Sequence, residues 1–290
     1  MPITALRLEC GQAIAMVLAE HLENFVWPAP LSVALHEVTD GGNWAIEAHF
    51  DPAPDETTIA DVLRQALGGT ALPVFSLSSI KPRDWVAASL ENLKPVRAGR
   101  IFVHGAHDRN KIPAAAIAVQ IDAGQAFGTG HHQTTTACLL ALGDIAAVLR
   151  PRRILDVGTG SGVLAIAAAK LLKTEVVATD NDPIAIAVAK ANARANGVAP
   201  LFAGRVAHGV RHRDVARARG YDLIFANILA RPLARLAGEI SACLDRRGNL
   251  VLSGILNSQN QSVLAAYQAR GLVLRRRIRL GDWTTLVIGG

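Results

Sequence analysis

The chain has 290 residues, half of them hydrophobic, and a formal net charge of +6. This length allows two domains with separate cores, and the hydrophobic share argues against disorder. The three cysteines, Cys10, Cys138 and Cys243, are scattered outside metal-ligand spacing, which disfavours a zinc or disulfide framework and favours a reducing compartment. No apolar run approaches the roughly 18 residues of a membrane span, and the start of the chain lacks a secretory signal. We therefore expect a cytoplasmic protein.

Residues 1–82 alternate the patterns of strands and helices. Strands are predicted at 5–10, 32–38, 44–50 and 75–80, and helices at 14–22 and from residue 55 onward. The order β-α-β-β-α-β is that of a small ferredoxin-like α+β domain. Nothing in it suggests catalysis, so we expect this domain to recognise a substrate.

Residues 83–112 are predicted to be a linker that contains a short helix at 85–93. The remaining segment, 113–290, begins with a strand at 117–121, a glycine-rich loop at 124–134 and a helix at 135–149. Strands and helices then alternate, which indicates a parallel, doubly wound sheet. The expected fold class is thus α/β, with a Rossmann-like second domain.

A hydrophobic strand from Ile154 leads into a glycine loop, and a second strand ends at Asp180, 22 residues after Gly158. The glycines Gly158, Gly160 and Gly162 occupy positions 1, 3 and 5, whereas a dinucleotide fingerprint has them at 1, 3 and 6. Asp156 adds negative charge beside the loop, which disfavours a phosphate. A cofactor with a positive centre fits better, and S-adenosylmethionine also has ribose hydroxyls that can donate to Asp180. The loop resembles motif I of the seven-stranded methyltransferases.

Two further strand ends carry polar side chains. After Asp180, Asp182 is a suitable N-cap and Pro183 a suitable first residue for the next helix, which leaves Asp180 free to bind a ligand. The fourth strand of the second domain ends at Asn227, whose amide can orient an amine beside the transferring methyl group. Residues 228–230 are Ile, Leu and Ala. They offer no aromatic platform for a flat base, so a flexible aliphatic amine is the expected substrate.

The segment Phe127–Thr135 holds two glycines and two adjacent histidines. No third ligand lies at a suitable spacing, so no metal site is predicted. The glycines allow close approach to the cofactor, and the Thr135 hydroxyl can hydrogen-bond it. The alternative is a structural turn that caps the following helix.

Arginines cluster at 150–153, 205–219 and 275–279. Such clusters can contact RNA phosphates. No aromatic residue interleaves with them, so a solvated surface is the alternative and any contact with ribosomal RNA is expected to be weak.

Taken together, five segments resemble the bacterial family that trimethylates large-subunit ribosomal protein eleven; these are residues 126–136, 155–167, 180–183, 192–197 and 227–233. The first and last are more specific than the glycine loop. The resemblance covers nearly the whole chain and is strongest from 120 to 260, whereas the N-terminal domain agrees in layout more than in residues.

The resemblance implies an S-adenosylmethionine-dependent protein-lysine methyltransferase, in which the N-terminal domain recognises the ribosomal protein and swings on the linker. Thr135, Gly158, Asp180 and Asn227 correspond to cofactor-contacting positions of the family. The full predicted cofactor set is Phe127, Thr135, Asp156, Gly158, Gly160, Asp180 and Asn227. Asn227 is also expected to orient the amine, with no dedicated general base, and the protein is expected to be a monomer.

Three alternatives stay open at this point. The protein substrate can be a different one, or the acceptor can be RNA, as the arginine clusters suggest. A non-enzymatic module that senses the cofactor or assists ribosome assembly would bind S-adenosylmethionine without turnover.

Overall fold

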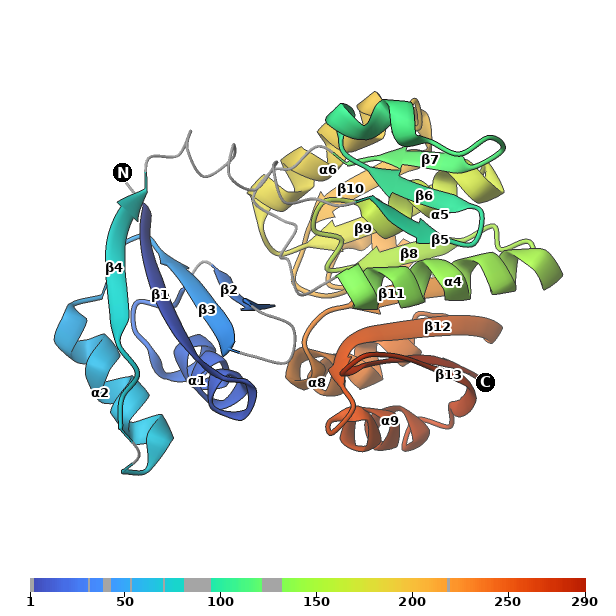
Figure 1. Cartoon of the computed structure of the whole chain (residues 1–290). Helices are drawn as coiled ribbons and strands as arrows, with labels where there is room; N and C mark the ends of the chain where they lie inside the picture. The colour runs from blue at the N-terminus through green and yellow to red at the C-terminus, as the bar shows by residue number, and fades with distance from the viewer. Residues whose placement is uncertain are drawn as a thin grey trace. The chain divides into compact units, whose positions relative to one another are not determined.

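The structure, a computed structural model, describes residues 3–30, 32–38, 43–52, 54–69, 71–80, 95–121, 132–217 and 220–290. These residues divide into two compact units, 3–80 and 95–290 (Figure 1). The predicted helix at 85–93 and the predicted cofactor residue Phe127 lie outside the described residues. No helix within the described ranges is long and apolar enough to cross a membrane.

The N-terminal unit has its elements in the predicted order β-α-β-β-α-β. They are β1 (Ile3–Gly11), α1 (Gln12–Phe25), β2 (Ser32–Glu37), β3 (Asn43–Phe50), α2 (Glu56–Leu67) and β4 (Phe75–Ile80). The sheet has the strand order β2-β3-β1-β4, and every neighbouring pair is antiparallel. The assignment of this unit to the ferredoxin-like class stays a prediction.

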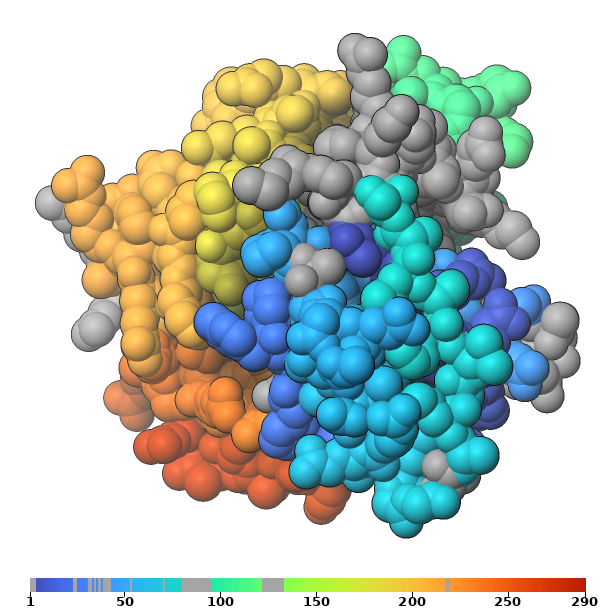
Figure 2. All heavy atoms as spheres, turned by 90° about the vertical axis from the view of Figure 1, so that its left-hand side faces the viewer, coloured from blue at the N-terminus to red at the C-terminus, as the bar shows by residue number. Residues whose placement is uncertain are grey.

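The core of the N-terminal unit lies between the sheet and its two helices. Leu6 and Leu8 of β1 alternate with polar residues, and they are buried with Leu18 of α1 and Leu63 of α2. Asp55 caps α2 by accepting the amide hydrogen of Thr58 at 2.8 Å. In the space-filling view of Figure 2, α2 and β4 (light blue to cyan) form the front of this unit.

The second unit begins with a small sheet of order β5-β6-β7. Its elements are β5 (Val96–Ala98), β6 (Ile101–His104), the 3-10 helix η1 (Ala106–Lys111) and β7 (Ile117–Gln120). Residues 83–112 are predicted to be a linker because the segment 94–100 is rich in Lys, Pro, Arg and Gly. The structure differs here: Gly99, with a φ of +57°, lets β5 and β6 form a hairpin, and Ala98 and Ile101 are buried in the core of the second unit.

The main sheet of the second unit has seven strands in the order β10-β9-β8-β11-β12-β14-β13. The pairs from β10 to β12 are parallel, as predicted, whereas β14 is antiparallel to both of its neighbours. The strands are β8 (Ile154–Val157), β9 (Val176–Asp180), β10 (Phe202–Val206), β11 (Tyr221–Asn227), β12 (Leu244–Leu256), β13 (Val273–Leu280) and β14 (Trp283–Gly289). The helices are α4 (His132–Val148), α5 (Val163–Leu172), α6 (Pro183–Ala195), η3 (Ala199–Leu201), α7 (Arg213–Arg217), α8 (Ala230–Ser241) and α9 (Asn260–Gln268).

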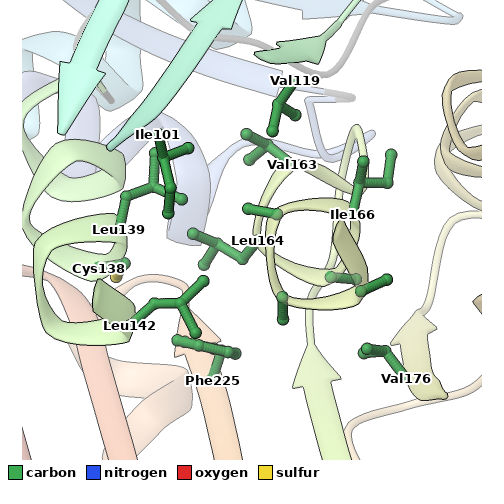
Figure 3. Packing of buried hydrophobic residues seen from close by; sticks show 14 of the residues in the cluster. Ile101, Val119, Cys138, Leu139, Leu142, Val163, Leu164, Ile166, Val176 and Phe225 are labelled. Atoms are coloured by element: carbon green, nitrogen blue, oxygen red, sulfur yellow. The ribbon is translucent and has the colours of Figure 1, made fainter. Parts of the chain in front are cut away.

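Helices cover both faces of the main sheet, so its central strands are apolar on both sides. In β11, Leu223 and Phe225 join the core under α4 and α5, whereas Ile224 and Ala226 join the core under α8 and α9. Figure 3 shows Phe225 among side chains of α4, α5 and the small sheet. By the two-residue period of strands, Asp156 lies on the same face as Ile154, and Asn227 on the same face as Phe225. The α4–α5 face therefore carries both predicted polar residues.

Candidate active site

The glycine loop between β8 and α5 is held by its own backbone. Gly158, Gly160 and Gly162 have φ values of +69°, +53° and +85°, a backbone region that residues other than glycine rarely adopt. The amides of Gly158 and Thr159 both donate to the carbonyl of Thr179 in β9, at 2.8 and 2.9 Å. The loop is thereby attached to the neighbouring strand.

Two more loop amides are also occupied. The Gly160 amide donates to Asp180 Oδ2 at 2.9 Å, and the Gly162 amide donates to the Thr159 carbonyl at 2.9 Å. In a phosphate-binding loop such N–H groups point at the ligand. Here four of them are used internally, so the loop does not form a phosphate cradle, in agreement with the glycine spacing.

Asp156 lies at the base of the loop and is only 1% exposed. Its Oδ2 accepts the Thr159 hydroxyl at 2.6 Å and the Ala165 amide at 3.2 Å. The pKa of this carboxyl is raised to about 7, mainly by burial and to a smaller extent by nearby Asp180, against the opposing effect of the two hydrogen bonds. Asp156 thus fastens the loop to the first turn of α5. A direct contact between Asp156 and a cofactor stays a prediction.

Asp180 ends β9 and is partly exposed at the carboxyl edge of the sheet. Besides Gly160, it accepts the Asp182 amide at 3.1 Å through Oδ1. Asp182 itself accepts the Ile184 amide at 2.8 Å and, with Pro183 following, caps α6 as predicted. The two acids therefore have different tasks: one caps a helix, and the other stands at the ligand edge.

Ile228 lies directly after β11 and is confined between two glycines. A Cβ at Gly158 would stand 2.3 Å from Ile228 Cγ2, and a Cβ at Gly254 of β12 would stand 2.4 Å from the Ile228 carbonyl oxygen. Real Cβ atoms do not approach that closely. The glycine loop, the end of β11 and the middle of β12 therefore meet at one residue.

Asn227 occupies the last position of β11, beside Ser253 of β12. Its Oδ1 is buried and accepts no hydrogen bond from any described residue. A buried acceptor without a partner costs about 1–3 kcal/mol. Ser253 differs, because its Oγ pairs with Thr285 Oγ1 at 2.6 Å. Asn227 thus offers an unused acceptor at the sheet edge where ligands bind in such folds.

Thr135 lies in the first turn of α4 and is 2% exposed. The sequence predicts that the helix begins at Thr135, but it begins three residues earlier, at His132, in a polar segment without hydrophobic periodicity. The carbonyl of the adjacent Thr134 stands 3.4 Å from Ser253 Oγ. This places the start of α4 close to the end of β11, and contact of Thr135 with the cofactor stays a prediction.

The structure brings Thr135, Asp156, Gly158, Gly160, Asp180 and Asn227 to one edge of the main sheet. Within the described ranges, no three His, Cys, Asp or Glu residues stand close enough to hold a metal ion. Sequence reasoning missed Ile228 and Gly254, and also the Thr179 carbonyl that accepts two loop amides. A glycine in a motif indicates that another group packs closely against the backbone, but it does not identify that group. A backbone carbonyl that accepts hydrogen bonds leaves no signal in the sequence.

The sequence profile described as "Ribosomal protein L11 methyltransferase (PrmA)" matches residues 8–289. The chain belongs to this family. A relative from Rhodopseudomonas palustris, named ribosomal protein L11 methyltransferase, is 46% identical over 258 residues, which are 89% of this chain and 87% of the relative. A relative of the same name from Bradyrhizobium diazoefficiens is 41% identical over 278 residues, covering 96% and 94% of the two chains.

A solved family structure agrees as well. The ribosomal protein L11 methylase from Lactobacillus delbrueckii subsp. bulgaricus is 30% identical with a TM-score of 0.61, over 68% of this chain and 98% of that one. The chain is accordingly an S-adenosylmethionine-dependent methyltransferase with a Rossmann-like domain.

The residues of the site fit this cofactor. S-adenosylmethionine carries a sulfonium and no phosphate, and the loop has four occupied amides and one partly exposed carboxyl group beside it, that of Asp180. Asp180 stands at the carboxyl edge of the sheet, where its binding to the ribose hydroxyls stays a prediction. The occupied amides and the carboxyl group of Asp180 thus suit a cationic nucleoside better than a phosphate.

Proposed function

We propose that this chain transfers methyl groups from S-adenosylmethionine to lysine side chains and the N-terminal amine of ribosomal protein L11, up to the trimethyl state. The names of the relatives support the substrate. The observation that carries the chemistry is the unpartnered Oδ1 of Asn227 at the end of β11, where no described residue donates to it. We propose the same residues for cofactor binding as the sequence indicated, with Asp180 on the ribose and the glycine loop beneath the nucleoside.

When bound, S-adenosylmethionine supplies an electrophilic methyl group and leaves as a neutral thioether. The chain has to align an amine with that methyl group. Asn227 accepts one N–H of the incoming amine through Oδ1, which points the nitrogen lone pair away from the amide and satisfies the buried acceptor. The amine nitrogen gains the methyl carbon, and its surplus proton goes to solvent.

The amine has to be neutral before it attacks. For a lysine of pKa near 10.4, deprotonation at pH 7 costs about 4.6 kcal/mol, from about 3.4 units at 1.36 kcal/mol each. Removal of the ammonium from water lowers its pKa and offsets part of this cost. Orientation of the reactants contributes several kcal/mol more. We therefore propose that no dedicated base is used.

The surroundings of Asn227 favour an aliphatic amine over a nucleic acid base. The next residues are Ile228, Leu229 and Ala230, and Leu229 is 42% exposed. A base would need a flat aromatic partner on which to stack, whereas the thin chain of lysine can lie along aliphatic side chains.

The N-terminal unit is proposed to recognise the protein substrate. Its Trp27 is 82% exposed and Phe25 is 61% exposed. Tryptophan is enriched among residues that dominate the energy of protein interfaces, where truncation costs about 2 kcal/mol or more. We expect Trp27→Ala to raise the KM for the protein substrate roughly 30-fold with cofactor affinity unchanged. Val74→Ala, at a 93% exposed position of the same unit, is the control and should change neither.

We further propose that the protein acts in the cytoplasm as a monomer and contacts ribosomal RNA weakly through its arginines.

The decisive experiment incubates the purified chain with methyl-labelled S-adenosylmethionine and ribosomal extract, followed by separation of protein from RNA and mass spectrometry. Label on ribosomal protein L11, in steps of one methyl at lysine or at the N-terminal amine, supports the proposal. Label on RNA alone would overturn the substrate, and label on another protein would redirect it. Cofactor binding without any label would indicate a non-enzymatic module.

A further inference from the structure

A hollow of about 700 Å³ lies against α8, lined by residues before and within α7, within and just after α8, and just after α9. Four exposed arginines stand around it: Arg211, Arg213, Arg235 and Arg270. Among the described residues that line it, Glu239 is the only acidic one. We refer to this hollow as the arginine groove.

The four arginines of the groove differ in whether an acidic side chain already pairs with them. Glu239 binds Arg211 through two hydrogen bonds of 2.6 and 3.0 Å, and Arg213 stands 3.6 Å from Asp214. Arg235 and Arg270 have no hydrogen bond or ion pair with any described residue. The groove therefore retains a surplus of positive charge, concentrated on two guanidinium groups.

Arg270 is held close to the wall of the groove. Its guanidinium carbon would be 3.4 Å from a Cβ at Gly238 of α8, so the missing side chain lets the arginine lie directly against the helix. This placement positions one planar fork of N–H donors over the groove. Such a fork matches phosphate oxygens in geometry as well as in charge.

The arginine groove is separate from the methyl-transfer site. Asn227 ends β11 at the carboxyl edge of the sheet, and α8 starts at Ala230 and runs away from it. Glu239 is nine residues along this helix, about 13 Å at 1.5 Å per residue. A ligand in the groove can therefore be held while the active site works.

We propose that the arginine groove binds the phosphodiester backbone of RNA without reading its sequence. Phosphates need the charge and donor geometry that Arg235 and Arg270 offer. The described lining residues include no Phe, Tyr or Trp, so they form no platform for stacked bases. An acidic peptide fits less well, because protein interfaces usually need a large apolar anchor, and the apolar lining residues here are small: Val210, Ala216, Ala242 and Cys243. This locates the RNA contact proposed above in one groove and does not depend on the methyl-transfer proposal.

The test measures binding of a fluorescein-labelled 20-nucleotide poly(U) RNA to the full chain by anisotropy at 50, 100 and 200 mM salt, concentrations chosen to resolve the roughly linear log–log salt dependence. The double variant Arg235→Ser/Arg270→Ser should bind at least about 10-fold more weakly at the lowest salt. Its slope of log K against log salt should be shallower by about 1.4, because each of the two phosphates that it no longer neutralises accounts for about 0.7. Arg277→Ser/Arg279→Ser on β13 removes the same charge from another exposed surface and should stay within about 2-fold of wild type.

A second variant acts in the opposite direction. Glu239→Gln releases Arg211 and should strengthen RNA binding several-fold. Equal weakening by the two arginine doubles, or no response to Glu239→Gln, would overturn the proposal in favour of a diffuse charge effect. If polyglutamate of matched charge binds as tightly as RNA and its binding is abolished in Arg235→Ser/Arg270→Ser, the groove takes an acidic peptide and the proposal is wrong. Methyl transfer to RNA-free ribosomal protein L11 should persist in the arginine double, which separates this test from that of the proposed function.

Discussion

At the carboxyl edge of the main sheet, the joined ends of β8 and β9 are built differently from the neighbouring end of β11; we call them the paired end and the unpaired end. At β8 and β9 four loop amides have acceptors, and Asp156 and Asp180 each accept two hydrogen bonds, although the buried hydroxyl of Thr179 has no described partner. At β11 the Asn227 acceptor has no described partner. The loop amides and the two carboxyl groups of the first end are hydrogen-bonded before any ligand arrives, whereas the Asn227 acceptor of the second end is not.

The difference fits the two molecules that the site has to handle. A cofactor of fixed shape can be met by a rigid loop, which loses little entropy on binding. The substrate amine exchanges its N–H groups for methyl groups during the reaction, so its hydrogen bond to the enzyme has to form and break. The paired end therefore suits the cofactor, and the unpaired end suits the amine.

The largest effect is expected from Gly158→Ala, which disturbs both ends through Ile228. The new Cβ would stand 2.3 Å from Ile228 Cγ2 at a φ of +69°. Left-handed strain of about 1–2 kcal/mol and overpacking of about 1–3 kcal/mol should add, and methyl transfer should be abolished. Gly197→Ala is the matched control, because Gly197 has the same φ and nothing within 4 Å. In urea unfolding, Gly197→Ala should lose only the stability that corresponds to the left-handed strain. Adding Ile228→Ala to Gly158→Ala should restore part of the stability and of the methyl transfer.

The next largest effect concerns Asp156 at the paired end and is seen in the pH dependence of the free energy of unfolding. The pKa of Asp156 is raised from 3.8 to about 7, mainly by burial. The folded state therefore keeps this proton more tightly than the unfolded state does, and the stability contributed below pH 4 is lost as pH rises to about 7. Relative to Asp156→Asn, the wild-type free energy of unfolding should fall by up to about 4 kcal/mol over that window. Parallel curves for the two proteins would show that Asp156 is ionised throughout.

Asn227→Ala tests the unpaired end. Loss of one positioned hydrogen bond should lower kcat roughly 100-fold for an unmodified lysine, with normal cofactor binding. A neutral dimethyl-lysine has no N–H left to donate, so the third transfer should be nearly unaffected. Single-turnover rates on unmodified and dimethylated substrates provide the comparison. Unchanged turnover on the unmodified lysine would falsify the role of Asn227.

A smaller effect is expected for Asp180→Ala, which removes the acceptor of the Gly160 amide and the proposed partner of the ribose. Cofactor affinity should fall about 30-fold, or about 2 kcal/mol, typical of hydrogen bonds to a charged group. Asp182→Ala, two residues away, should cost about 1 kcal/mol of stability through loss of its cap and leave affinity near wild type. Calorimetric titration separates the two, and equal losses of affinity would contradict the division of tasks between these acids.

Much of the fold could be predicted because hydrophobic period and turn chemistry act locally. The apolar strand that ends at Asn227 and the Asp182-Pro183 start of α6 are examples that the structure confirms. The β5–β6 hairpin was missed because its three-residue strand has the composition of a linker, and only burial of Ala98 in a distant core makes it a strand. The first turn of α4 was missed because polar residues carry no helical periodicity.

The positions of Asp180 and Asn227 at strand ends could be predicted from the strand patterns, and the structure confirms these positions, whereas their roles stay predictions. It was not predictable where the decisive property is a tertiary relation. Asp156 is buried and accepts two hydrogen bonds, whereas Asn227 Oδ1 has no described partner. Both properties depend on which helices cover the sheet, so neither can be read from neighbouring residues in the chain.

The confinement of Ile228 between Gly158 and Gly254 also limits how this enzyme can diverge or be redesigned. A larger residue at any of the three positions has to be compensated at another, so we expect them to change together during evolution. Attempts to broaden the range of accepted amines should therefore begin at Leu229, which is 42% exposed, and leave the neighbouring isoleucine untouched.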